Sequence, residues 1–230
     1  MQQSMFDILL ALPLFQGLGH ADLTRILEST HLEFVTIGPG ETACQQDATC
    51  DRIIFVIEGK LAAHTLSADR QWGVIEHLSQ PAIVGLDVLY GRRRTFTFTA
   101  TALTRTKLLV VDKRTMGALF RYFEVMQINA LNHLTSELAR RDAPLWLPAT
   151  TSLEARILHF CRLHLLRPAG YKCFDISQRA LGDYLGEDPR YISKALQRME
   201  NDGLLKRSRR SIEFPAFEKA LSQAYHTAST

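Results

Sequence analysis

Residues 178–201 read QRALGDYLGEDPRYISKALQRMEN, an order of residue types that predicts two helices joined by a tight turn. The helices are predicted over Gln178–Leu185 and Pro189–Asn201. Gly186 can adopt the left-handed conformation that ends a helix, and Asp188 can accept a hydrogen bond from the free amides that start the next one. Pro189 suits a first helical position, because the amide there has no partner within the helix.

The second predicted helix has two chemically different faces. Ile192, Leu196 and Met199 recur at helical spacing and would pack against the first helix. The other face carries Arg190, Ser193, Lys194 and Arg198. A helix-turn-helix places the N-terminal half of such a second helix in the major groove of DNA. There, Arg190 and Lys194 could donate to guanine, whereas a serine is less selective.

Basic residues on either side extend this DNA-binding surface. Gln178 and Arg179, at the start of the first helix, are placed to hold phosphates, which fix register without reading sequence. After the second helix, a basic stretch at 206–210 lies between apolar residues, so a β-turn there would form a wing. The residues predicted to contact DNA are Gln178, Arg179, Arg190, Tyr191, Ser193, Lys194, Arg198, Arg207, Arg209 and Arg210.

The region from residue 32 to residue 112 has the pattern of strands. Apolar runs at 32–37, 53–57, 61–66, 72–78 and 107–111 are separated by turn signals. Threonine alternates with apolar residues from Thr95 to Thr101, a period of two. A short helix at 21–29 precedes the strands. Many short, evenly spaced strands predict a small β-roll.

A change to helical spacing follows Asp112, which can cap a helix. The apolar spacing of a coiled-coil seam is carried by Phe120, Phe123, Gln127, Leu131, Leu134 and Leu138. We therefore predict one long helix over 113–142 that pairs with its copy in a homodimer. The alternative is a helix packed on the roll of its own chain.

Pro144 and Pro148 end the long helix and indicate a hinge. Thr151 and Glu154 have the spacing of a capping box that would start the next helix. The predicted fold class is α+β, with a β-roll sensor domain at 1–112, a dimerisation helix at 113–142, a hinge at 143–150 and a winged helix-turn-helix domain at 151–230. A helical spacing after Phe214 predicts a last short helix, to which the sequence assigns no role.

Composition narrows the class of protein. The chain of 230 residues is 46% hydrophobic and 22% charged, as in globular proteins, and no apolar run approaches the length of a bilayer span. The N-terminus lacks the basic start of a secretory signal, so a cytoplasmic protein is expected. The spacing of Cys44, Cys50, Cys161 and Cys173 predicts reduced thiols and no metal site, with a Cys44–Cys50 bridge as the alternative.

The chain resembles, over nearly its whole length, the family of the cyclic AMP receptor protein and the fumarate and nitrate reduction regulator, CRP/FNR. The resemblance rests on the helix-turn-helix and on Leu14-Phe15-Gln16-Gly17-Leu18, Gly40-Glu41, Ile54-Phe55-Val56-Ile57-Glu58-Gly59, Gly85 and Arg94-Thr95. It implies a cyclic-nucleotide-binding-like roll, a double-stranded β-helix, that senses a small-molecule effector. It also implies base contacts from Arg190, Ser193 and Lys194. Pro189 departs from the family, which usually carries a polar contact there, so the operator should differ.

The effector pocket implied by the resemblance is formed by Gly85, Leu86, Arg94, Thr95, Thr135 and Ser136. Members that bind cyclic nucleotides hold the phosphate with Arg-Ser and the ribose hydroxyl with a glutamate directly after the glycine. Leu86 occupies the glutamate's position and cannot accept that hydrogen bond, at a cost of about 1 to 3 kcal/mol. Asp87, if on a strand, should face the other side. These residues argue against cyclic AMP itself and leave the effector unidentified.

The protein is predicted to be a transcription regulator that binds double-stranded promoter DNA sequence-specifically. RNA polymerase is its second predicted partner. The alternative is a ligand-binding module that acts through a protein partner. The sequence has no glycine-rich phosphate loop, no zinc-protease motif and no nucleophile elbow, so no enzyme is predicted. It has no cysteine cluster near the N-terminus for an iron-sulfur centre, and neither His64 nor His77 is assigned to haem, so no cofactor or membrane contact is predicted.

Overall fold

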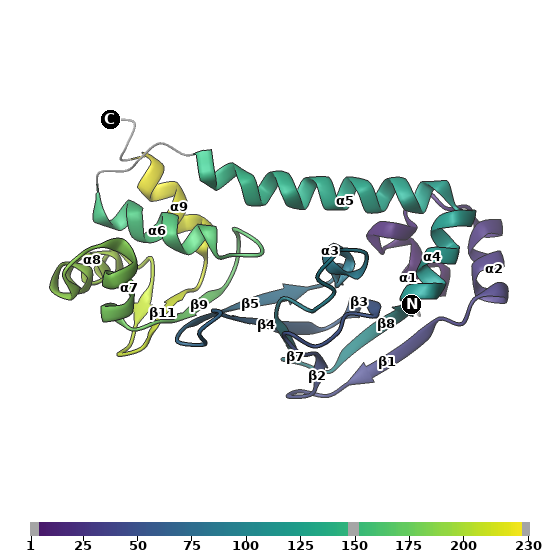
Figure 1. Cartoon of the computed structure of the whole chain (residues 1–230), viewed down its shortest axis with the longest axis horizontal. Coiled ribbons are helices and arrows are strands. Elements are labelled where there is room, and N and C mark those ends of the chain that lie inside the picture. Colours follow the sequence, from purple (N-terminus) through teal and green to yellow (C-terminus); the bar gives the residue numbers. More distant parts are fainter. Residues whose placement is uncertain (1–4, 147–151, 227–230) are drawn as a thin grey trace. The chain divides into compact units, whose positions relative to one another are not determined.

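The computed structural model describes residues 5–146 and 152–226 (Figure 1). Contacts within the chain divide it into two compact units, and each is described by itself. Unit 1 comprises Met1–Ala62 and Leu78–Ala139, and unit 2 comprises Ala63–His77 and Arg140–Thr230. Unit 2 thus includes a short segment from the middle of the strand region. The domain boundaries drawn from the sequence stay predictions.

Unit 1 begins with three short helical segments. They are α1 (Met5–Leu10), η1 (Pro13–Phe15) and α2 (His20–Ser29). α2 confirms the helix predicted over 21–29, and its Leu23 and Ile26 are fully buried. The Asp22 carboxylate accepts a hydrogen bond from the Gly19 amide at 3.1 Å, which satisfies one of the free amides at the helix start.

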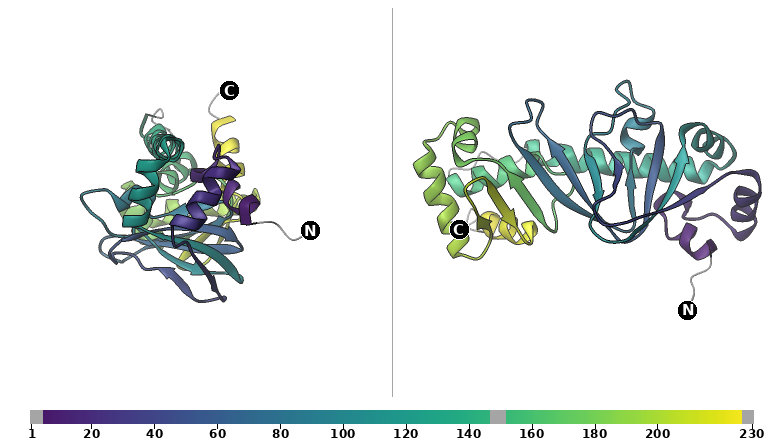
Figure 2. Two further views of the ribbon diagram at one scale, coloured as in Figure 1. Left: turned by 90° about the vertical axis from the view of Figure 1, so that its right-hand side faces the viewer. Right: turned by 90° about the horizontal axis from the view of Figure 1, so that it is seen from below.

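The strands of unit 1 can be followed in the ribbon views of Figure 2. Four of them form an antiparallel sheet, and two more pair at one end of a seven-stranded sheet. The order in the sheet is β1 (Glu33–Ile37), β8 (Thr106–Asp112), β3 (Arg52–Glu58) and β6 (Ala82–Val84), and β2 (Thr42–Cys44) pairs with β7 (Thr99–Ala102). Four successive residues of β3, Ile53 to Val56, are at most 1% exposed, so this strand is buried on both faces. This arrangement confirms the predicted β-roll.

Two parts of the strand region differ from the expectation. The alternating stretch from Thr95 forms a regular strand only from Thr99, although Phe96 and Phe98 do point into the core. Asp87, considered above as a strand residue, lies in the short helix α3 (Leu86–Leu89). Gly85 explains this turn of the chain, because its φ of +92° is in the left-handed region that favours glycine.

The prediction of a single long helix after Asp112 is wrong. The structure has two helices, α4 (Lys113–Tyr122) and α5 (Glu124–Asp142), separated at Phe123. Asp112 caps α4 as expected, because its side chain accepts hydrogen bonds from the amides of residues 114 and 115. At the break, Phe123 is 8% exposed and buries its ring in unit 1, while the Gln127 side chain donates to the Phe120 carbonyl left free there. Phe123 therefore does not belong to an exposed seam.

In the described residues, the C-terminal part of unit 2 contains five helical segments and three strands. They are η2 (Ala143–Trp146), α6 (Leu153–Leu163), β9 (Lys172–Asp175), α7 (Gln178–Leu185), α8 (Pro189–Asn201), β10 (Lys206–Arg207), β11 (Ser211–Phe214) and α9 (Phe217–His226). β9, β10 and β11 form antiparallel pairs, with β11 in the middle. The β10–β11 hairpin is the predicted wing.

The start of α6 differs from the predicted capping box. Ser152 is the N-cap, and its hydroxyl accepts a hydrogen bond from the Ala155 amide at 3.2 Å. Thr151 lies outside the described residues, as does the part of the predicted hinge from 147 to 150.

The core of unit 2 gathers the apolar faces of all its main elements. Ile157 of α6, Leu181 of α7, Leu196 of α8 and Phe214 of β11 are each fully buried. Phe217 of α9 is also fully buried, and its ring meets that of Phe214 edge to face at 5.0 Å. The last helix therefore closes this core, a role that the sequence left open.

The part of the chain that the structure describes holds no helix long and apolar enough to cross a bilayer. All four cysteines are free thiols, so the alternative Cys44–Cys50 bridge is not formed. Burial raises the pKa of Cys44 to about 11 and also raises that of Cys50. Both thiols are therefore protonated at neutral pH.

Candidate nucleic-acid interface

The turn between α7 and α8 has the geometry that its residues predict. Gly186 ends α7 in the left-handed conformation, with φ of +68°. Asp188 is the N-cap of α8, and its carboxylate accepts a hydrogen bond from the Arg190 amide at 2.8 Å. Ser177 caps α7 in the same way, at 3.1 Å from the Ala180 amide. Both helices begin and end at the residues predicted from the sequence.

Gly182 fixes how closely the two helices approach, and the sequence analysis did not identify it. A Cβ built on Gly182 would lie 2.6 Å from the Glu187 carbonyl oxygen and 3.6 Å from the Ile192 side chain. The Glu187 amide donates to the Gly182 carbonyl at 2.9 Å. A glycine in the middle of an amphipathic helix, four residues before the turn, was the available signal.

Side chains of α6 contact the turn and α8. The Arg156 guanidinium donates to the Glu187 carboxylate and to the Leu185 carbonyl. Glu154, in the first turn of the same helix, lies 2.6 Å from the Arg198 guanidinium of α8. These ion pairs fix the turn and α8 against α6, so the helix-turn-helix is part of one packed unit.

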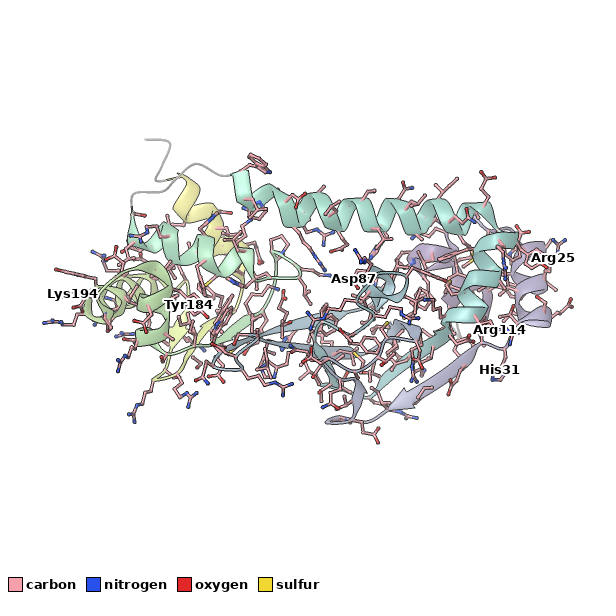
Figure 3. All side chains as sticks on the ribbon, viewed as in Figure 1. Arg25, His31, Asp87, Arg114, Tyr184 and Lys194 are labelled. Carbon is pink, nitrogen blue, oxygen red and sulfur yellow. The ribbon has the colours of Figure 1, made fainter. Side chains whose placement is uncertain are left out.

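The outward face of α8 is cationic. The Arg190 side chain is 88% exposed, the Arg198 side chain is 66% exposed, and Tyr191 is 59% exposed. Lys194 is exposed and points away from the unit (Figure 3). The inward face carries Ile192, which is fully buried. The separation of charged and apolar faces is therefore as predicted, and Arg190 and Lys194 both stand on the solvent side.

The flanking basic residues fall into two groups. Arg179 is exposed at the start of α7, beside the half-buried Gln178. Arg209 and Arg210 are exposed in the turn of the β10–β11 hairpin. This turn is closed by Ser208, whose amide donates to the Ser211 carbonyl at 2.8 Å.

Arg207, unlike Arg209 and Arg210, is engaged inside the unit. Its Nε donates to Glu200 Oε2 at 2.8 Å, and its amide donates to Glu200 Oε1 at 3.0 Å. Its Nη1 lies 3.2 Å from the Ser193 hydroxyl and 3.3 Å from the Ser193 carbonyl. The Arg207 side chain is only 23% exposed. The Arg207 guanidinium, predicted to face DNA, thus joins the wing to α8, and it occupies the Ser193 hydroxyl as well.

Two of the exposed cations have an acidic neighbour. Arg190 Nε lies 3.3 Å from Asp188 Oδ1, and Arg198 is paired with Glu154. Hydrogen bonds from the Arg190 amide and from its guanidinium hold the pKa of Asp188 below its ordinary value. Asp188 is therefore ionised at neutral pH and offsets part of the charge that Arg190 offers.

The residues predicted for the effector pocket are only partly brought together. Leu86 is 5% exposed at the start of α3, and Asp87 lies on that helix, not on a strand (Figure 3). Arg94 is exposed and Thr95 is half-buried. Thr135 and Ser136 are exposed on α5, where the Thr135 hydroxyl donates to the Leu131 carbonyl at 2.8 Å.

Cys50 connects the two ends of this pocket segment, which the sequence analysis did not foresee. Its amide donates to the Arg94 carbonyl at 2.9 Å, and its Sγ lies 3.6 Å from the Gly85 carbonyl oxygen. A Cβ on Gly85 would lie 3.0 Å from this sulfur and 2.9 Å from the Arg52 carbonyl oxygen. Gly85 is therefore required by close packing as well as by its backbone angle.

Comparison with known proteins agrees with this geometry. Residues 34–122 match the family model of the cyclic nucleotide-binding domain. The structure of the Thermus thermophilus catabolite activator protein superposes with a TM-score of 0.52 at 20% sequence identity, covering 93% of this chain and 99% of that one. The chain therefore has the fold of the catabolite activator protein.

Other structures with this CRP/FNR likeness match less closely. A second Thermus thermophilus protein, a transcriptional regulator of the CRP/FNR family, has a TM-score of 0.44 at 17% identity, covering 84% of this chain and 98% of that chain. The N-terminal domain of a Streptomyces coelicolor transcriptional regulator has a TM-score of 0.48 at 22% identity, covering 64% of this chain and all of that domain. No protein with a curated description matches the sequence.

The match to the family model covers only part of the chain. The matched segment 34–122 contains the roll, α3 and α4. The helix-turn-helix and wing lie beyond it, so their interpretation rests on the α7–α8 geometry and on the fold shared with the catabolite activator protein, which covers 93% of the chain.

Proposed function

We propose that this protein is a sequence-specific, double-stranded-DNA-binding transcription regulator with an effector-sensing roll. The observation that carries the proposal is the outward face of α8, where Arg190 and Lys194 stand exposed on a helix that α6 and α7 hold in place. A cationic helix of this kind, following a tight turn and preceding a basic hairpin, fits the major groove. The function needs no catalytic group.

The exposed cations are placed for two kinds of DNA contact, with bases and with phosphates. Arg190 and Lys194, in the N-terminal half of α8, are placed to donate to base edges. Arg179 at the start of α7 and Arg209 and Arg210 in the wing are placed to neutralise phosphates, which supplies affinity without sequence information. Arg207 supports these contacts indirectly, because its guanidinium is bonded to Glu200 and Ser193.

A homodimer through α5 would deliver two reading helices. Ile128, Leu131 and Leu138 of α5 are 48%, 61% and 59% exposed, which is a large apolar area for a helix in a single chain. Pairing of this helix with its copy would cover these side chains. The two α8 helices would then read half-sites one DNA turn apart, about 34–36 Å. Such a dimer would act at promoters in the cytoplasm, with RNA polymerase as its partner there.

A small molecule bound by the roll would change the arrangement of this dimer. Gly85, Leu86, Arg94 and Thr95 are held in one segment by Cys50. Because Leu86 is buried and cannot accept a hydrogen bond, this segment lacks the acceptor that a ribose hydroxyl needs. An effector other than cyclic AMP fits these residues better.

The test is a fluorescence-anisotropy titration of the full chain against the promoter region of its own operon. We expect tight binding to one inverted-repeat site and an affinity that falls steeply with salt. The Lys194→Ala variant should lose base preference, whereas Arg25→Ala, which removes another exposed charge from α2, should not change binding. Equal weak binding to every duplex would contradict the proposal.

A further inference from the structure

A hairpin from the strand region is built into unit 2. The hairpin consists of residues 63–77 and contains parts of β4 (Lys60–Leu66) and β5 (Gly73–Ser79). β5 pairs with β9 in antiparallel register from Gly73 opposite Asp175 to Glu76 opposite Lys172. The sheet of unit 2 therefore continues from the wing through β11 and β9 into this hairpin.

Trp72 attaches the hairpin to α6 and α7. It is 7% exposed, and its ring lies 5.5 Å from the Phe160 ring and 4.8 Å from the His164 ring, centroid to centroid. Its indole Nε1 donates to the Tyr184 hydroxyl at 2.9 Å. Tyr184 belongs to α7, the first helix of the helix-turn-helix (Figure 3). The hairpin thus contacts the element against which α8 packs.

Glu76 provides a second attachment, deeper in the unit. Glu76 Oε1 lies 3.2 Å from Lys172 Nζ, and both side chains are 1% exposed. Glu76 also accepts hydrogen bonds from the amides of Leu166 at 2.7 Å and Arg167 at 3.1 Å, where the chain leaves α6. Burial lowers the pKa of Lys172, and the Glu76 carboxylate opposes that shift. A buried ammonium needs such a partner, because an unpaired buried charge is very costly.

We propose that the hairpin of residues 63–77 is a positioning arm of the DNA-binding unit, with Trp72 and Glu76 as its positioning residues. The inference rests on the proposed function, since it concerns how α7 and α8 are held for DNA. Trp72 fixes α7 through Tyr184, and Glu76 fixes the end of α6 through Leu166 and Arg167.

The arm is also part of the covalent connection between the two units. The chain passes between the two units at three points, residues 62–63, 77–78 and 139–140. Unit 2 is therefore tied to unit 1 by both strands of the hairpin as well as by α5.

The attachment of the arm can be measured without DNA, because the chain has two tryptophans in contrasting surroundings. Trp72 is 7% exposed, while Trp146 is 85% exposed. In the full-length Trp146→Phe variant we expect blue-shifted emission, with acrylamide quenching several-fold weaker than for the Trp72→Phe variant, in which Trp146 emits. Equal quenching of the two proteins would overturn the proposal.

Positioning is tested in the Trp146→Phe background with Glu76→Gln. This change should increase the quenching of Trp72 and lower the affinity for the promoter duplex several-fold. The slope of log affinity against log salt should not change, because Glu76 neutralises no phosphate. Adding Lys172→Met should restore part of both losses, because it removes the unpaired ammonium. The matched control is Glu58→Gln, which breaks an exposed pair with Lys107 and should leave both readouts unchanged.

Unchanged DNA affinity in Glu76→Gln would overturn the positioning role. If that variant does not fold, Tyr184→Phe replaces it, because the change removes only the acceptor of the Trp72 indole. The same loss of affinity is then expected, and unchanged affinity again contradicts the role. A wild-type protein that binds no duplex would contradict the proposed function, whereas the quenching of Trp72 would still decide whether the arm is attached.

Discussion

Arg207 Nε lies 2.8 Å from Glu200 Oε2, and this ion pair joins the first strand of the wing to α8. The same guanidinium reaches the Ser193 hydroxyl and carbonyl about two turns earlier in α8. Arg207, a basic residue of the wing, therefore stabilises the position of the wing. The neighbouring Arg209 and Arg210 remain exposed for other contacts.

The first prediction separates these two roles by salt dependence. Arg209→Ala should reduce the slope of log affinity against log salt by about 1.8, the value for two phosphate contacts, because each protomer of the proposed dimer loses one. Arg207→Ala should weaken binding as well, but without reducing the slope, because its charge is already paired with Glu200. Anisotropy titrations at several salt concentrations measure both. A reduced slope in Arg207→Ala would show that Arg207 contacts a phosphate of the DNA.

The second prediction concerns the acid stability of the wing. The hydrogen bonds from the Arg207 side chain and amide hold the pKa of Glu200 below its ordinary value of 4.5. The stabilisation is therefore fully present above pH 4.5 and is lost as the pH falls through the lowered pKa of the folded protein. An NMR titration of the Glu200 carboxyl should show its pKa rising toward 4.5 in Arg207→Ala. A pKa that does not rise would show that the pair is absent in solution.

Composition and spacing predicted the helix-turn-helix because its signals are local. Gly186, Asp188 and Pro189 each act on the backbone within one turn of their own position, and the structure has all three in the expected roles. The role of Arg207 could not be predicted in this way. A basic residue in a basic stretch looks the same whether its partner is a phosphate or a glutamate seven residues earlier.

The division of the helix after Asp112 into α4 and α5 also could not be predicted from the sequence. Apolar spacing runs through Phe120 and Phe123 without interruption, and there is no proline or glycine at the break. The chain turns because the Phe123 ring enters the core of unit 1, and the Gln127 side chain compensates the lost hydrogen bond. The attachment of residues 63–77 to unit 2 was likewise hidden, since it depends on β9 and on pairings between segments far apart in the sequence.

The third prediction tests the close approach at Gly182. Gly182→Ala should destabilise the protein by about 1–3 kcal/mol, a typical cost of overpacking, because the new Cβ would lie 2.6 Å from the Glu187 carbonyl oxygen. Gly117→Ala in α4 is the matched control, since its Cβ would be 3.6 Å from the Tyr90 hydroxyl. Better helix propensity should make that variant more stable by about 0.5–1 kcal/mol. Urea denaturation measures both, and equal stabilities would contradict the packing argument.

The fourth prediction concerns the negative charge beside Arg190. Asp188→Ser keeps a side-chain oxygen for the Arg190 amide, so α8 should retain its cap. The change removes the carboxylate 3.3 Å from Arg190 Nε, and affinity for DNA should therefore rise several-fold. Asp188→Ala removes both charge and cap, and should be less stable by about 0.5–2 kcal/mol. Weaker DNA binding by a stable Asp188→Ser protein would show that the carboxylate itself orients Arg190.

The fifth prediction tests the proposed pairing of α5. Leu138 is 59% exposed and Leu131, seven residues earlier on the same face, is 61% exposed. Leu138→Glu should leave the fold of the chain intact, because the side chain is already largely in solvent, but a paired helix would have to bury its carboxylate. We expect sedimentation equilibrium to show a monomer and the affinity for an inverted-repeat duplex to fall well over tenfold. Asn132→Glu adds the same charge at an exposed polar position of α5 and should remain dimeric. A Leu138→Glu dimer that still binds the duplex tightly would place the interface on another surface, since no helix seam tolerates two facing carboxylates without a large loss of affinity.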